Sequence, residues 1–314
     1  MTREVFAHIR QRSPLIPESK IESHVLSEDI QAFCAGTGTD TPDILSLSRR
    51  MTAFEFNACV KNGVTDIVEI RVGLEALVLV MRNQDAAFPL TFETFYRAIS
   101  GDLPVGDDYV PNASLNWHDV DPKLPNTDIH VVIPSQEASS RVYFDKRFME
   151  GGCREIPEYK NIFSAAERVA ECNDLRKDGH VIELGGAYTA TTLIATLDKS
   201  PPGTIGVLSL RYALESADKV KMLSLEGVMP SRETVGNMVY PATRKLNYYV
   251  KRAHIKDYTG KGPVAGLREF ITEVTRESAI GDRGYLVALG LVPSPKDARE
   301  AIRESALALT PMER

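Results

Sequence analysis

The polar residues that could perform catalysis are scattered along this sequence rather than grouped in a known pattern. Serine, histidine and aspartate are all present, but the GxSxG arrangement of a serine nucleophile is absent. The HExxH pattern and the GxxxxGK[ST] loop are absent too. Gly36-Thr37-Gly38 has the glycines of a phosphate loop, but no lysine follows, and we interpret it as a turn. The six histidines are dispersed. We therefore expect a protein that is not an enzyme.

The four cysteines are Cys34, Cys59, Cys153 and Cys172. None belongs to a CxxC pair and no histidine stands at zinc-finger spacing, so we expect no bound metal and no cofactor. Pairing each cysteine with its nearer neighbour, 34 with 59 and 153 with 172, would close loops of ordinary size. Four cysteines allow three connectivities, and four buried thiols explain the composition equally well.

Length and charge narrow the class of protein and its partners. The chain has 314 residues, which suits one large two-lobed unit or two modest domains. The net charge is -6 and no Lys/Arg-rich run occurs, so we expect no nucleic acid partner. No apolar run approaches the roughly 20 residues of a membrane span. Residues 1–8 lack the apolar segment of a signal peptide, which indicates either a cytosolic protein or a processed or trimmed chain.

Short apolar runs alternate with amphipathic segments along the whole chain. The expected strands cover 64–71, 73–81, 129–133, 203–209 and 246–250. The expected helices cover 91–99, 139–149, 264–278 and 295–307, and Gly151-Gly152 should stop the second of them. This alternation predicts an α/β protein with a parallel or mixed sheet. No linker divides the chain, so two lobes would be joined by strands that cross between them.

Several segments, taken in order, resemble the phosphate-binding proteins of bacterial Pst-type ABC transporters. The resemblance covers roughly residues 25–300. The matching segments are Phe33–Gly36, Thr41–Ile44, Ser48–Met51, Cys59–Val64, Asn116–Trp117, Arg176–Gly179, Tyr240–Arg244, Gly284–Leu286 and Gly290–Pro293. No segment is decisive alone, but their joint order and spacing are specific.

The resemblance implies a fold and a function. The fold is the two-lobed α/β periplasmic-binding-protein type II fold with two crossing segments. Lobe one would comprise 1–77 plus 248–314, and lobe two 78–247. The implied function is to bind phosphate or a related oxyanion in an inter-lobe cleft, in the periplasm. The protein would then deliver it to the membrane permease of an ABC transporter, with hinge closure as the working motion.

The family holds its anion with helix N-termini, Ser/Thr hydroxyls and an arginine, donors suited to a dehydrated oxyanion. Its Ser-Gly-Thr-Arg pattern is matched by Ser139, Ser140 and Arg141, where the arginine would pair with the anion or brace the loop. Ordinary capping of the 139–149 helix explains these serines equally well. Ser48 and Arg49 are the second candidate pair, although Arg49 cannot accept the proton of hydrogen phosphate. A surface role for Arg49 explains it equally well.

Three departures from the family pattern favour a second hypothesis. Ser27, Glu28 and Asp29 replace a glycine-rich anion loop. Ser27 is a remaining candidate ligand there, or simply a helix N-cap, while the two carboxylates would repel an anion. The lobe-two segment Gly185–Thr189 lacks the family's acidic and amide groups, and the N-terminal strand is missing or reduced to Arg3–Phe6. The alternative is a degenerate relative with altered or lost ligand, acting as an accessory subunit of a larger complex.

Overall fold

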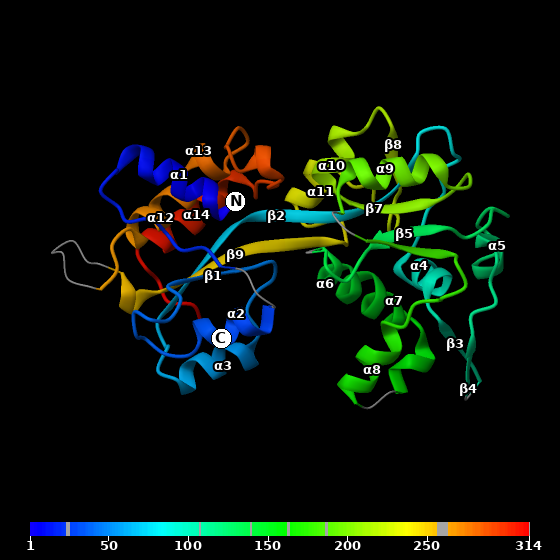
Figure 1. Ribbon diagram of the computed structural model, residues 1–314, viewed down its shortest axis with the longest axis horizontal. Coiled ribbons are helices and arrows are strands. Elements are labelled where there is room, and N and C mark those ends of the chain that lie inside the picture. The colour runs from blue at the N-terminus through cyan, green and yellow to red at the C-terminus, as the bar shows by residue number, and fades with distance from the viewer. Residues whose placement is uncertain are drawn as a thin grey trace. The chain divides into compact units, whose positions relative to one another are not determined.

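The computed structural model describes residues 1–22, 26–106, 108–138, 140–161, 164–185, 188–255 and 263–313 (Figure 1). The chain forms two compact units. The first comprises Met1–Glu75 and Arg244–Arg314, and the second Ala76–Thr243. The chain therefore passes between the units twice, once within strand β2 (Ile67–Arg82) and once near the start of strand β9 (Thr243–Lys251). The crossings expected from the sequence were after residue 77 and before residue 248.

The first unit is built on three neighbouring strands in the order β1-β9-β2, where β1 is Ile44–Leu47. β1 and β9 pair antiparallel, with Leu45 opposite Tyr249 and Leu47 opposite Asn247. Because side chains alternate along a strand, these strands present two different faces. Leu45, Leu47 and Tyr249 lie in one hydrophobic cluster, whereas Tyr248 and Val250 lie in another.

Helices cover both faces of these strands. The cluster with Tyr248 includes residues of α1 (Thr2–Arg12), α12 (Leu267–Val274), α13 (Glu277–Ile280) and α14 (Lys296–Leu307). The cluster with Tyr249 includes residues of α2 (Leu26–Phe33) and α3 (Ala53–Lys61). Short 3₁₀ turns occupy Arg252–His254 and Val287–Leu289. The expected helix over 264–278 is thus two helices, because α12 ends at Val274 and α13 begins at Glu277.

The N-terminal segment is helical and not a reduced strand. Arg3–Phe6 lies within α1, whose Val5 and Ile9 are buried four residues apart on one face. Phe6 stacks on Phe270 of α12 with ring centroids 5.2 Å apart. This i, i+4 apolar spacing was a readable helix signal in the sequence.

The second unit holds a mixed sheet. The later part of β2 pairs antiparallel with β7 (Ile205–Ser209) and β8 (Val220–Met222). β7 then pairs parallel with β5 (Val131–Pro134), and β5 with β6 (Val181–Leu184). A separate hairpin joins β3 (Asp102–Val105) and β4 (Asp108–Pro111). The mixed α/β architecture expected from the sequence is confirmed.

The helices of the second unit are short. The helix expected over 91–99 is α4 (Phe92–Ile99), and Thr91 caps it through a reciprocal box with Thr94. Further helices of this unit are α5 (Trp117–Val120), α8 (Ala165–Cys172), α9 (Ala190–Lys199), α10 (Leu210–Glu215) and α11 (Arg232–Gly236), with a 3₁₀ turn at Pro157–Asn161.

The helix expected to stop at Gly151-Gly152 continues through both glycines. It consists of α6 (Arg141–Phe144), a π-helical turn (Asp145–Met149) and α7 (Glu150–Glu155). Gly152 serves packing and not termination, because a Cβ there would lie 2.4 Å from the Phe92 carbonyl oxygen and 2.5 Å from Tyr96 Cβ. The predicted stop was wrong because a glycine that permits close helix packing has the same sequence signature as one that ends a helix.

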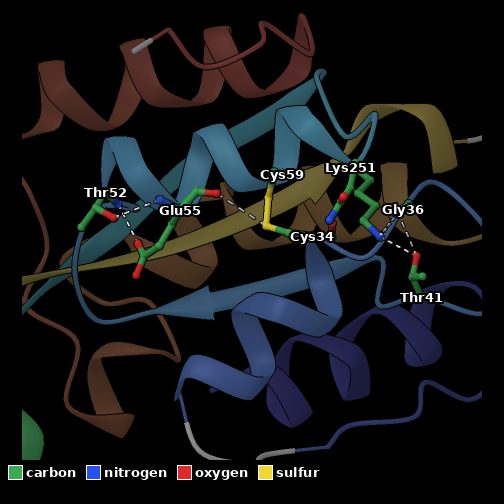
Figure 2. The surroundings of a disulfide bond; sticks show 8 residues. Cys34, Gly36, Thr41, Thr52, Glu55, Cys59 and Lys251 are labelled. Atoms are coloured by element: carbon green, nitrogen blue, oxygen red, sulfur yellow. Dashed lines mark hydrogen bonds between the residues drawn. A yellow bond between two sulfur atoms is a disulfide. The ribbon is translucent and has the colours of Figure 1, made fainter.

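Both sequence-local cysteine pairs are disulfides. Cys34–Cys59 joins the residue after α2 to α3, with Cα atoms 4.3 Å apart (Figure 2). Cys153–Cys172 joins α7 to α8, with Cα atoms 5.6 Å apart. Of the three possible connectivities, the structure therefore selects the local one, and the alternative of four thiols is wrong.

Candidate functional site

Ser48 and Arg49 directly follow the last residue of β1. Both are half-buried. Within the described part of the chain, the Ser48 hydroxyl makes no hydrogen bond, so it is available as a donor. The Arg49 guanidinium, in contrast, is already paired with a carboxylate.

Arg49 is held by Glu55 through two parallel bonds. Arg49 Nη1 donates to Glu55 Oε2 at 2.8 Å, and Nη2 donates to Oε1 at 2.6 Å. Glu55 also accepts from the Thr52 backbone N–H at 2.7 Å, which completes the capping box of α3. Burial raises the pKa of Glu55, but the bonds from Arg49 and Thr52 outweigh it and bring that pKa to about 2. A bidentate pair of this kind neutralises the guanidinium, so Arg49 braces the start of α3.

Arg141 is buried at the start of α6, with only 2% of the residue exposed. Its Nε donates to Asp145 Oδ1 at 2.5 Å, one helical turn along. Its Nη1 donates to Glu183 Oε2 at 2.5 Å and to the Pro134 carbonyl at 3.1 Å. With its amide oxygen turned toward Arg141, Gln136 accepts from Nη2 at 2.7 Å. Arg141 therefore braces the loop after β5, one of the two roles expected for it.

The carboxylates around Arg141 outnumber its single charge. Burial raises the pKa of Asp145, and the nearby charges of Glu183 and Glu150 raise it further, although Arg141 counteracts both. Glu137 lies in the same loop, where Ser135 Oγ donates to its Oε2 at 2.7 Å. An anion approaching Arg141 would therefore meet a negative surrounding.

The three serine candidates have different positions. Ser140 is half-buried at the N-cap of α6, but its side chain caps nothing and makes no hydrogen bond within the described residues. Ser139 lies outside the described residues. Ser27 is exposed in the first turn of α2, since the helix begins at Leu26, so it is not the N-cap that the sequence suggested. Glu28 and Asp29 occupy the same first turn.

The segment Gly185–Thr189 is only partly described, because residues 186 and 187 lie outside the described residues. Thr189 is the N-cap of α9 and forms a reciprocal capping box with Thr192. Its hydroxyl is thereby engaged with the helix start.

The turn at Gly36–Thr41 is organised around a buried cation. Lys251, 1% exposed, donates from Nζ to the Gly36 carbonyl at 2.7 Å and to Thr41 Oγ1 at 2.5 Å (Figure 2). Burial lowers the pKa of Lys251 to about 8, despite the opposing charges of Asp43 and Asp40. The interpretation of Gly36-Thr37-Gly38 as a turn is confirmed, and the Gly36 carbonyl oxygen of this turn points at a cation.

The carboxylates that pair with Arg49 and Arg141 were not among the residues predicted from the sequence. Two had a readable signal: Glu55 stands three residues after Thr52 in a T-x-x-E capping pattern, and Asp145 stands four residues after Arg141 on one helix. Glu183 had none. It reaches Arg141 because β6 pairs with β5 so that Glu183 lies opposite Ile133.

Two kinds of feature are missing from the described part of the chain. It contains no group of three or more His, Cys, Asp or Glu side chains placed to hold a metal ion. Nor does any described helix combine the length and the apolar character needed to cross a membrane.

The comparison with protein families decides the relationship. Residues 21–278 match the model of the PBP superfamily domain. The chain belongs to the PBP superfamily. No curated protein sequence matches this superfamily member significantly.

Solved structures share the fold of this PBP superfamily member. A possible phosphate-binding protein from Planctomyces limnophilus is 18% identical, with a TM-score of 0.69 over 98% of this chain and 94% of that one. An ABC-type phosphate transport receptor from Vibrio cholerae is 15% identical, with a TM-score of 0.60 over 88% and 90%. PstS from Borrelia burgdorferi is 17% identical, with a TM-score of 0.59 over 88% of each chain. The resemblance seen in the sequence motifs is confirmed at the level of superfamily and fold.

Proposed function

We propose that this protein is an extracytoplasmic solute-binding protein, not an enzyme, that binds phosphate or a related oxyanion and delivers it to an ABC-transporter permease. The observation that carries the proposal is that two serine hydroxyls are available to donate to an anion. Ser48 follows strand β1 and Ser140 precedes helix α6, and neither hydroxyl makes a hydrogen bond within the described chain. The structural relatives are themselves phosphate-binding or phosphate-transport proteins by name.

The two disulfides support a location outside the cytoplasm. Disulfides persist in oxidising compartments such as the periplasm and are rare in the cytosol. Cys34–Cys59 and Cys153–Cys172 each tie neighbouring helices within one unit. A periplasmic location is therefore part of the proposal.

We expect this protein to bind phosphate more weakly than a phosphate-binding protein of this fold with an intact site. Arg49 and Arg141 are neutralised by Glu55, Asp145 and Glu183. A carboxylate about 4 Å from a bound anion opposes each unit of its charge by roughly 4 kcal/mol at an effective dielectric of about 20. That corresponds to about three decades of affinity, less where solvent screens the charge.

Two further carboxylates favour a second candidate function. If neither hydroxyl holds an anion, the chain is a degenerate relative that serves as an accessory subunit of a larger complex. Glu28 and Asp29 in the first turn of α2 favour this candidate, because they satisfy the positive helix end that an anion would otherwise occupy.

Calorimetry of the full chain with phosphate and with sulfate separates the two candidates. Saturable phosphate binding that weakens in Ser48→Ala and in Ser140→Ala supports the transport function. Ser305→Ala, at an exposed position of α14, is the matched control and should bind like wild type. Absence of saturable heat with either anion, in a folded sample, would reject oxyanion binding and leave the accessory role.

A further inference from the structure

One face of the strand pair β9–β2 changes character along its length. At one end, Ile67 and Tyr249 lie in the hydrophobic cluster beneath α2 and α3. Next, Tyr249 Oη donates to Glu69 Oε1 at 2.8 Å across the two strands. Arg50 Nε donates to the same carboxylate at 2.9 Å. Glu69 is therefore fully engaged by one tyrosine and one arginine.

Beyond Glu69 the same face becomes cationic. Side chains two residues apart share a face, so Arg71 follows Glu69 on β2, while Asn247 and Lys245 follow Tyr249 on β9. Arg71 and Lys245 are half-buried. Within the described residues, neither makes a hydrogen bond or an ion pair. Asn247 is 3% exposed, and its buried Nδ2 donor has no partner there.

Arg71 and Lys245 differ in this respect from the buried or half-buried arginines nearby. Arg49 is paired with Glu55, and Arg244 is paired with Glu75 at 2.6 Å. Burial lowers the pKa of Lys245, and the positive charges of Arg71 and Arg50 lower it further, with Glu69 opposing. Like charges brought together out of bulk water are unfavourable unless an opposite charge compensates them.

The cluster lies beside one of the available hydroxyls. Asn247 is directly opposite Leu47 in the β1–β9 register, and Ser48 is the next residue of the chain. An amide N–H donor and two cations are thus grouped on one face, and the Ser48 hydroxyl belongs to the residue that follows the end of β1 beside them. All four belong to the first unit. This combination of donors and charge suits an anion with several oxygen acceptors.

We propose that Arg71 and Lys245, together with Asn247 Nδ2 and the Ser48 hydroxyl, form an anion-binding cluster that takes an inorganic oxyanion. The cluster supplies the positive charge that Arg49 and Arg141 cannot. The identity of the anion as phosphate rests on the proposed function, whereas the existence of the cluster does not.

The test compares two double variants of the full chain that change the net charge equally. Arg71→Gln with Lys245→Gln should weaken phosphate or sulfate binding by about 10- to 100-fold in calorimetry. Arg3→Gln with Lys61→Gln changes two exposed cations of the same unit and should leave the affinity within about twofold. Without anion, the first double variant should also melt at a higher temperature than the control, since it removes a repulsive pair.

A second measurement separates the cluster from the proposed function. The NMR signal of the Lys245 side-chain amine should shift saturably as sulfate or phosphate is added, and its pKa should rise. Saturable phosphate binding without this shift, and unaffected by the Arg71 and Lys245 changes, overturns the cluster and leaves the function standing. A Lys245 shift with sulfate and none with phosphate overturns phosphate as the ligand and keeps the cluster. Neither shift nor heat with either anion rejects both.

Discussion

Replacing Glu183 by glutamine should tighten oxyanion binding if the carboxylates around Arg141 weaken it. Glu183 Oε2 lies 2.5 Å from Arg141 Nη1. An anion on the same guanidinium would sit about 6 Å from that carboxylate. At an effective dielectric of about 20, the repulsion is roughly 3 kcal/mol per unit charge. The Glu183 side chain is 42% exposed, so solvent screening reduces this to about 1–2 kcal/mol.

The expected gain in affinity is therefore about five- to thirtyfold. Calorimetric titration of Glu183→Gln with phosphate measures it, at constant ionic strength and with the fold checked by circular dichroism. The glutamine amide oxygen can still accept from Arg141, so the loop after β5 should be retained. Glu215→Gln is the matched control, because it breaks an exposed Arg–Glu pair of the same unit, Arg211 Nε to Glu215 Oε1 at 2.7 Å. An affinity equal in both variants and wild type would refute the electrostatic reasoning.

Three further changes test the structural argument. The pKa of Lys251 falls from 10.5 to about 8 on folding, so the unfolded chain binds more protons than the folded chain between these pH values. The free energy of unfolding should therefore rise by up to about 3 kcal/mol from pH 8 to 10.5. Denaturant titrations at several pH values measure this rise, and Lys251→Met should abolish it. Gly152→Ala should destabilise by about 1–3 kcal/mol in thermal melts, whereas Gly151→Ala, with nothing nearer than 3.9 Å, should stabilise by about 0.5–1 kcal/mol. Met238 has a φ of 58°, a left-handed backbone conformation that glycine adopts more easily, so Met238→Gly should raise the free energy of unfolding by about 1 kcal/mol. An unchanged or lower melting temperature would contradict backbone strain at this position.

Local patterns predicted many of the elements well. The helical spacing of apolar residues over 91–99 correctly gave α4, because helical periodicity is a property of neighbouring residues. The apolar runs that became β2 and β9 were also predicted as strands, although the two runs expected at 64–71 and 73–81 are one continuous strand that begins at Ile67. The nearer-neighbour disulfides were one of the alternatives that the sequence left open, and only the fold excluded the others.

Sequence by itself determined the mixed α/β class, the superfamily resemblance and the residue types that could hold an anion. It could not determine which of those residues remain available. Arg141 is occupied by Glu183 because two parallel strands align in one register, and the partner is 42 residues away in the chain. Arg71 and Lys245 share a face because β2 and β9, which are far apart in the sequence, are neighbouring strands. Charge compensation depends on distances between side chains on different strands, and only the tertiary structure sets these distances. The tertiary structure alone therefore decided which cations are neutralised.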